Sequence, residues 1–272
     1  MPVSLLIVEG NLDSEILASV LAGEPAVRRG GSKNGLAPQA RYERDMSKVK
    51  AAYLRDRDFD HEPPQNHHTV TVDRQDGSTV LGWRWARHEI ENYLLDPAIV
   101  EKAIGISAHD WSATLTEVAG RIRWYQIARW TIGQVRRVLP PSHQLRTRPA
   151  DLNELALPAL TDKPFSREWC LTSIGDFLEQ VTEKMSPESV EAKIDRYSGI
   201  LTEDNLGNIE TTLAWCSGKD LLAGLSCDSL RQSRCTNAGD LRAALRDWVR
   251  ENAGEAVAQF PEWQDLIRQV RV

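Results

Sequence analysis

The stretch Ser4-Leu5-Leu6-Ile7-Val8 is almost entirely apolar and ends in Glu9-Gly10. A continuous apolar run, without alternation, predicts a strand that is buried on both faces, as in a parallel sheet. A helix over 13–21 is predicted behind it, followed by a strand at 25–29, a helix over 38–49 and a strand at 51–54. This alternation predicts an α/β fold in which right-handed crossovers build a mainly parallel, Rossmann-like sheet.

The rest of the chain extends the sheet briefly and then becomes helical. Strands are predicted at 70–72 and 80–85, and a short helix at 88–95. Helical spacing dominates from Pro97 onward, over 111–139, 166–184, 187–200, 205–216 and 239–252. We therefore divide the chain into an α/β core at 1–96, a helical region at 97–215 and a C-terminal helical segment at 216–272. The segment 140–165 contains five prolines and is predicted to be a linker.

The composition of the 272-residue chain is typical of a folded globular protein, with 41% hydrophobic and 26% charged residues. The formal net charge is −6, but residues 97–148 carry 8 basic and 3 acidic side chains. An acidic total argues against a uniformly basic nucleic-acid coat, whereas this one stretch favours local contact with phosphates.

Neither a signal peptide nor a membrane span is predicted, because no apolar run is long enough for either. The four cysteines have no metal-ligand spacing, so we expect them to be reduced. Both observations indicate a cytoplasmic protein that does not act at a membrane.

Acidic residues follow two of the predicted strands directly. Glu9 follows the first strand, and Asp56 and Asp58 follow the third. The carboxyl ends of parallel strands are where α/β sheets bind ligands. Gathered carboxylates repel one another unless a cation neutralises them, and oxygen ligands suit Mg²⁺ or Mn²⁺. For each acid taken alone, helix capping or pairing to Arg55 or Arg57 is the favoured interpretation, so only the set predicts a metal site.

Four short motifs, in this order, resemble the Toprim signature of nucleases related to the OLD (overcoming lysogenisation defect) family. They are Leu6-Ile7-Val8-Glu9-Gly10-x-x-Asp13, Leu54-Arg55-Asp56-Arg57-Asp58, Glu89-Ile90-Glu91-Asn92-Tyr93-Leu94-Leu95 and Gly218-Lys219-Asp220-Leu221-Leu222. The resemblance covers the first 95 residues well and reaches residue 222 only through short motifs. Because the chain has no Walker A motif, it is similar to the small stand-alone Toprim nucleases and not to a full-length OLD ATPase-nuclease.

The resemblance implies a Toprim fold and a metal-dependent endonuclease. One or two Mg²⁺ (or Mn²⁺) ions would activate a water for attack on a phosphodiester, and Lys219 would stabilise the charge that develops. Lys219 is equally compatible with an ordinary lysine near a helix start. The implied metal ligands are Glu9, Asp13, Asp56, Asp58 and Glu91, and the implied catalytic residues are Glu9, Asp56, Asp58 and Lys219. Glu91 is favoured over Glu89 because it directly precedes the asparagine of its motif.

Partners are also implied by the resemblance. Some stand-alone Toprim nucleases are toxic effectors of phage-defence systems, such as the PARIS (phage anti-restriction-induced) system, in which the ATPase is a separate protein. We therefore expect a DNA or RNA substrate, tRNA included, a separate ATPase partner and a homodimer as a further option. The alternative is a Toprim-derived module that binds nucleic acid or regulates without catalysis. The acids at every expected position argue against that alternative.

The loop Gly30-Gly31-Ser32-Lys33-Asn34-Gly35 has two interpretations. Its amides and Lys33 could hold a substrate phosphate. The interpretation that we favour is that its glycines turn a tight corner between a strand and a helix.

The basic residues of 121–137 are predicted to lie along one side of a helix. A helical wheel places Trp124 in an apolar stripe, together with Ile127, Ala128, Ile132, Val135 and Val138. Trp130 falls on the opposite side, among Arg123, Arg129, Arg136 and Arg137. These arginines and Trp130 are candidates for binding phosphates and stacking a base. The alternatives are that Trp130 packs on a second helix, or that the arginines pair with the acidic C-terminal part.

Overall fold

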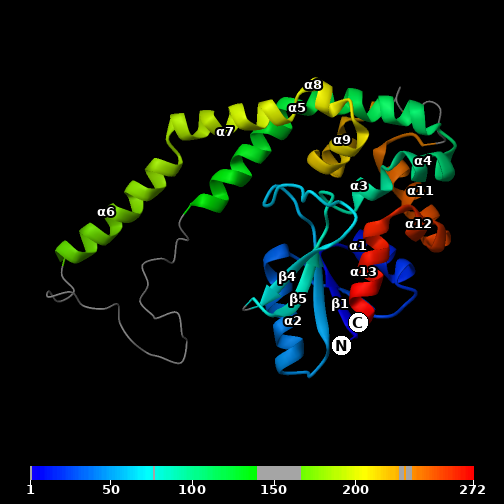
Figure 1. Ribbon diagram of the computed structural model, residues 1–272, viewed down its shortest axis with the longest axis horizontal. Coiled ribbons are helices and arrows are strands. Elements are labelled where there is room, and N and C mark those ends of the chain that lie inside the picture. The colour runs from blue at the N-terminus through cyan, green and yellow to red at the C-terminus, as the bar shows by residue number, and fades with distance from the viewer. Residues whose placement is uncertain (1, 76, 140–166, 227–229, 231–234) are drawn as a thin grey trace. The chain divides into compact units, whose positions relative to one another are not determined.

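The computed structural model describes residues 2–75, 77–139, 167–226, 230 and 235–272 (Figure 1). The predicted linker at 140–165 lies outside these residues. The described chain forms two compact units, one of Met1–Gln126 with Leu201–Val272 and one of Ile127–Ile200. These units cut across the boundaries expected at 96 and 215, because the helices after residue 201 pack around the α/β core.

The first unit contains a five-stranded sheet in the order β2-β1-β3-β5-β4. Its strands are β1 (Leu5–Val8), β2 (Ala26–Arg29), β3 (Ala51–Arg55), β4 (Thr71–Gln75) and β5 (Thr79–Arg84). Strand β1 pairs in parallel with β2 and β3, and β3 pairs in parallel with β5. Only β4 is antiparallel to its neighbour. The predicted α/β class with a mainly parallel sheet is confirmed.

Helices α1 (Asn11–Val20) and α2 (Lys33–Asp45) connect the first three strands. The chain steps from β1 to β2 in one direction and from β2 past β1 to β3 in the other. Right-handed crossovers therefore place the two helices on opposite faces of the sheet. On the α2 face, Ile7 and Tyr53 pack with Leu36 of the helix. The helix begins at Lys33 and not near residue 38 as expected, with Ser32 as its N-cap.

The C-terminal helices complete the first unit. They are α11 (Ala238–Glu251), α12 (Ala253–Gln259) and α13 (Pro261–Arg271), of which only the first was predicted. Helix α13 reaches the residues that precede β1, where the Val3 nitrogen donates to the Val270 carbonyl at 2.8 Å, and its Trp263 ring packs 5.5 Å from that of Tyr93. Glu262 accepts a hydrogen bond from the Ala86 nitrogen at 2.6 Å and another from the Tyr93 hydroxyl. These contacts tie the end of the chain to the sheet.

Five shorter helices surround the carboxyl ends of the strands. They are α3 (Glu91–Leu94), α4 (Pro97–Ile104), α8 (Glu203–Leu206), α9 (Ile209–Trp215) and α10 (Gly218–Gly224). The helix expected over 205–216 is thus two helices, and Asn208 caps the second by accepting hydrogen bonds from the Glu210 and Thr211 nitrogens.

The second unit is helical. The long α5 (Ala108–Val138) continues into it from the first unit, and α6 (Arg167–Lys184) and α7 (Pro187–Ile200) follow. Trp130 of α5 is fully buried and stacks on Tyr197 of α7, with ring centroids 5.6 Å apart. The predicted stacking platform at Trp130 is therefore wrong, and the alternative of packing on a second helix is confirmed.

The prediction that Trp124 lies in the core is also wrong, because its side chain is 62% exposed. The buried stripe of α5 runs through Gln126, Ile127, Trp130 and Val135. A wheel built on hydropathy alone predicted Ile127 and Val135 of this stripe but missed Trp130, because its packing partner Tyr197 lies more than sixty residues later in the chain.

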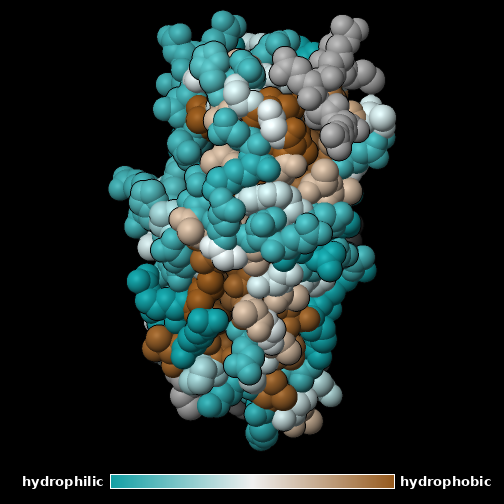
Figure 2. Space-filling model, turned by 90° about the vertical axis from the view of Figure 1, so that its right-hand side faces the viewer, coloured by the Kyte–Doolittle hydropathy of each residue, from teal (hydrophilic) through white to brown (hydrophobic). Residues whose placement is uncertain are grey.

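The face of the molecule that carries α11, α12 and α13 is mainly hydrophilic, with apolar side chains visible in scattered patches (Figure 2). Among the described residues, no helix combines the length and apolar character that crossing a membrane requires.

Candidate active site

The candidate site begins where β1 and β3 end side by side. Glu9 follows β1, and Asp56 follows β3. The Glu9 Oε1 accepts a hydrogen bond from the Asp56 nitrogen at 3.0 Å. The strand order reverses direction between β1 and β3, and this switch point is where open α/β sheets bind ligands.

Asp13 joins these two acids from the first turn of α1. Its Oδ2 accepts a hydrogen bond from the Gly10 nitrogen at 3.2 Å, which also satisfies an amide at the helix start. Asp13 and Asp56 are both buried.

Helices α3 and α10 pack tightly against each other near the carboxyl ends of the strands. The Asn92 Nδ2 donates to the carbonyls of Leu213 and Cys216 at 2.9 Å each, and its Oδ1 accepts from the Gly218 nitrogen at 3.1 Å. A Cβ on residue 218 would lie 2.8 Å from the Asn92 nitrogen and 2.8 Å from the Glu91 Cβ. Only glycine allows the backbones of α3 and α10 to come this close. The motifs that contain Asn92 and Gly218 therefore pack together and fix the position of Lys219.

Glu89 holds Lys219 in position. Its Oε1 accepts from the Ser217 hydroxyl at 2.7 Å and from the Lys219 nitrogen at 2.8 Å, and its Oε2 accepts from the Lys219 Nζ at 2.5 Å. The buried Gln126 of α5 supports the same turn, because its Oε1 accepts from the Ser217 nitrogen at 3.1 Å and its Nε2 donates to Asp220 at 2.8 Å. The Lys219 Nζ also lies 3.7 Å from Glu91 Oε2 and 3.9 Å from Asp56 Oδ2.

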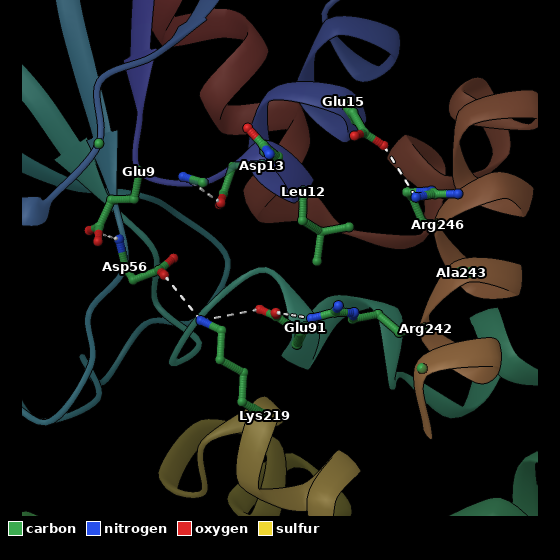
Figure 3. A pocket seen from close by; sticks show the side chains of 14 residues that line it. Glu9, Leu12, Asp13, Glu15, Asp56, Glu91, Lys219, Arg242, Ala243 and Arg246 are labelled. Atoms are coloured by element: carbon green, nitrogen blue, oxygen red, sulfur yellow. Dashed lines mark hydrogen bonds and ion pairs between the residues drawn. The ribbon is translucent and has the colours of Figure 1, made fainter. Parts of the chain in front are cut away.

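The acids of the strand ends, Glu91 and Lys219 line one cavity of about 500 Å³ (Figure 3). Its lining consists of an acidic group, a lysine, and a wall contributed by α11. The residues that carry charge are Glu9, Asp13, Glu15, Asp56, Glu91, Lys219, Arg242 and Arg246.

Burial shifts the protonation of the acids. It raises the pKa of Glu9 to about 7, with the Asp58 charge adding to the shift, and it raises the pKa of Glu91 to about 7, with Glu89 adding to it. Burial also holds the pKa of Asp56 well above its ordinary value and raises that of Asp13. Burial alone would lower the pKa of Lys219, but Glu89, Glu91 and Asp56 outweigh it and raise this pKa. The lining holds five carboxylates and three cationic side chains, and the buried carboxylates resist ionisation unless a cation lies close to them.

The free acceptor atoms of the cavity fit a cation. Asp56 Oδ1 and Glu91 Oε2 are buried, and neither accepts a hydrogen bond from any residue that the structure describes. An unsatisfied buried carboxylate oxygen is costly, and a hard divalent ion would satisfy it.

A second group of possible ligand atoms lies next to the cavity. The ligand atoms of Asp58, His88 and Glu89 lie within 4.8 Å of one another, so this group could hold a metal ion. Its carboxylates are already engaged, since Glu89 accepts three hydrogen bonds and Asp58 accepts one from the Lys33 Nζ at 2.6 Å. The unsatisfied carboxylate oxygens therefore favour the cavity over this second group as the metal site.

The structure brings five of the predicted site residues together and separates the others. Glu9, Asp13, Asp56, Glu91 and Lys219 line the cavity. Asp58 does not line it, although its charge raises the pKa of Glu9. Asp58 has a left-handed φ of 48°, and its nitrogen donates to the His88 carbonyl at 3.2 Å.

Lys33 and Arg123 have partners within the first unit, whereas phosphate binding by Arg129, Arg136 and Arg137 stays a prediction. The Lys33 ammonium pairs with Asp58 and Asp60, which argues against the less favoured interpretation of this loop as a phosphate cradle. Gly31 has a φ of 88°, which matches the favoured interpretation of a tight corner. Arg123 donates to the Leu201 carbonyl and lies over the Trp124 ring. The remaining three arginines belong to the second unit, namely Arg129, Arg136 and Arg137.

Sequence reasoning missed Gln126, Arg242 and Arg246. Neither arginine lies in a recognisable motif, and α11 follows the first acidic motif by more than two hundred residues. The spacing of Arg242 and Arg246 on one face of a helix was the only available signal, and it is common on solvated helices. No protein-family model matches this chain, and no curated protein matches it.

Proposed function

We propose that this protein is a Toprim-type nuclease that hydrolyses phosphodiester bonds of nucleic acid with the help of Mg²⁺ or Mn²⁺. The observation that carries the proposal is the cluster of buried carboxylates at the switch point between β1 and β3. Two of its oxygens, Asp56 Oδ1 and Glu91 Oε2, have no hydrogen-bond donor among the described residues. An uncompensated acidic cluster is expensive in folding free energy, so its presence beside an anchored lysine favours a catalytic metal site.

Glu9 and Asp56, which meet at the ends of β1 and β3, would hold an ion, with Asp13 and Glu91 as further carboxylates of the same cavity. When bound, a divalent ion would lower the pKa of a water and neutralise charge on the phosphate. Glu89 is assigned a different role from its neighbour Glu91, because its oxygens are already occupied by Ser217 and Lys219.

Lys219 would stabilise the negative charge that develops on the phosphate or on the leaving oxygen. Its raised pKa keeps the ammonium protonated across the physiological range. Glu89 orients the ammonium toward Asp56 and Glu91, so the positive charge is positioned before substrate binds. A charge that is already in place stabilises the transition state without any rearrangement of the protein during the reaction.

The biological setting remains the one that the motif resemblance implies. We propose a toxic effector in antiphage defence that a separate ATPase activates, acting on DNA or RNA. Its support is the order of the four motifs together with the close packing of the last two around Asn92 and Gly218.

The test compares wild type with Glu9→Gln and Asp56→Asn on labelled DNA and RNA, in Mg²⁺, Mn²⁺ and EDTA. The matched control is Asp60→Asn, because Asp60 pairs with Lys33 in the same segment but does not line the cavity. We expect cleavage to need metal, to fall about 10²–10³-fold in the two site variants and to persist in the control.

Two further readouts cover an enzyme that needs its partner for turnover. Calorimetry should detect Mn²⁺ binding to wild type and its loss in Asp56→Asn, and expression in bacteria should be toxic only for wild type and the control. Equal cleavage, metal binding and toxicity in all four proteins would refute the proposed site.

A further inference from the structure

Helix α11 supplies the wall of the cavity that faces the acidic cluster. In Figure 3, Glu9 and Asp56 lie on one side and Arg242 and Arg246 on the other. The two arginines lie one helical turn apart, with Ala243 between them also facing the cavity.

Both arginines are accessible and only loosely paired within the cavity. Arg242 Nη1 lies 3.7 Å from Glu91 Oε1, which is an ion pair without a hydrogen bond, and its side chain is 49% exposed. Arg246 Nη1 lies 3.5 Å from Glu15 Oε2, and its side chain is 30% exposed. The Nε and Nη2 of Arg246 both pair with Asp247 Oδ1 at 2.8 Å, outside the cavity, so Nη1 is the nitrogen that is loosely paired. Lys219 differs, because its ammonium donates a 2.5 Å hydrogen bond to Glu89.

Cations on this wall favour the entry of an anionic substrate into a cavity that is lined by carboxylates. Glu9, Asp13 and Asp56 repel a phosphodiester, and Lys219 is already shared among three carboxylates. A guanidinium presents several N–H donors in a plane that matches two phosphate oxygens, so it suits a backbone phosphate better than a base. Two guanidinium groups one turn apart, about 5–6 Å between Cβ atoms, suit successive phosphates of one strand.

We propose that Arg242 and Arg246 bind successive backbone phosphates of the nucleic-acid strand that enters the cavity between α11 and the acidic cluster. This rests on the proposed nuclease function and adds the residues that hold its substrate. Arg242, which lies next to Glu91, contacts the phosphate nearer to the scissile bond, and Arg246 contacts the next one along the helix. Because phosphates carry no sequence information, the contact is independent of base sequence.

The test measures binding of fluorescein-labelled single-stranded DNA and RNA by anisotropy, in Ca²⁺ and in EDTA, over a range of salt concentrations. Wild type is compared with Arg242→Gln, Arg246→Gln and the control Arg250→Gln, which changes an exposed arginine of the same helix outside the cavity. We expect the two cavity variants to bind several-fold more weakly on every sequence. Their plot of log K against log salt concentration should be shallower by about 0.7 each, and the control should match wild type.

If Arg242 only neutralises Glu91, different results are expected. Such a role changes metal affinity or folding and leaves the salt dependence of oligonucleotide binding unchanged. The salt slope of Arg242→Gln separates the two roles, and Arg242→Lys should keep most of the wild-type slope because a lysine keeps the charge. In cleavage assays, phosphate binding predicts a raised KM with a smaller change in kcat.

The outcomes distinguish this inference from the proposed function. If wild type cleaves or binds nucleic acid and both cavity variants keep its affinity and salt slope, the assignment of the arginines is wrong and the nuclease stands. If wild type neither binds nor cleaves any of the oligonucleotides and shows no metal-dependent toxicity, both are wrong.

Discussion

The cavity of the first unit and the α5–α7 contact of the second unit are built on opposite principles. In the cavity, carboxylates are buried without enough hydrogen bonds, as the free Asp56 Oδ1 shows. In the second unit, the central contact is a buried stack of Trp130 on Tyr197. Burying charge costs stability, whereas burying an aromatic pair contributes it. Residues that serve chemistry and residues that serve folding should therefore respond to substitution with opposite signs.

The largest expected effect is on stability in the second unit. Trp130→Ala should lower the free energy of unfolding by about 3–5 kcal/mol, because it leaves a cavity beside Tyr197. Trp124→Ala, on the same helix but 62% exposed, should change it by about 0.5 kcal/mol or less. Denaturant unfolding followed by circular dichroism measures both, and equal losses would contradict the assignment of the buried stripe.

Lys219→Met should lower activity. We expect kcat to fall about 10²–10³-fold, equivalent to about 3–4 kcal/mol, because a preorganised charge at the phosphate is lost. Lys102→Met is the control, because Lys102 forms a surface ion pair with Glu255 outside the cavity. Steady-state kinetics with a defined oligonucleotide distinguishes them, and an unchanged kcat would remove Lys219 from the mechanism.

Glu262 provides a buried acid that serves folding, for comparison with Asp56. Burial raises the pKa of Glu262 to about 8, although Tyr93 and the Ala86 nitrogen donate to it. The folded state therefore holds this proton more tightly than the unfolded state, so the contribution is complete below about pH 4.5 and is lost as pH rises toward 8.

Glu262→Gln keeps the shape of the protonated acid and removes this titration. Metal-free wild type should lose stability between pH 5 and 8, and the variant should lose less, by up to about 1.4 kcal/mol per pH unit. The cavity acids contribute with the same sign in both proteins, so the difference isolates Glu262. Identical pH profiles in unfolding experiments would contradict the raised pKa.

The smallest expected effect is a gain in stability, whereas most substitutions of buried residues lower it. Asp56→Asn should stabilise the metal-free protein by about 1–3 kcal/mol at pH 8, because it replaces a buried and poorly hydrogen-bonded carboxylate with a neutral amide. Adding Mg²⁺ should raise the Tm of wild type and leave that of the variant unchanged. A variant less stable than wild type in EDTA would show that the carboxylate serves folding after all.

Local patterns in the sequence were sufficient for the sheet and for the acids at its edge. The continuous apolar run at Leu5–Val8 predicted a buried strand, and the position of Glu9 and Asp56 after their strands predicted that they would meet. Both inferences hold because strand ends are local features, and parallel strands necessarily align their carboxyl ends. The same locality explains the error at Trp124 and Trp130, where hydropathy along one helix contains no information about α7.

The sequence by itself determined that carboxylates gather at the carboxyl edge of an α/β sheet. Only the tertiary structure decided which of them have unsatisfied oxygens, that Glu89 holds Lys219 while Glu91 faces the cavity, and that Asp58 turns toward Lys33. It also brought Arg242 and Arg246 to the wall opposite those acids. The physical reason is that burial, hydrogen-bond partners and opposing charges come from segments far apart in the chain, which no local spacing specifies.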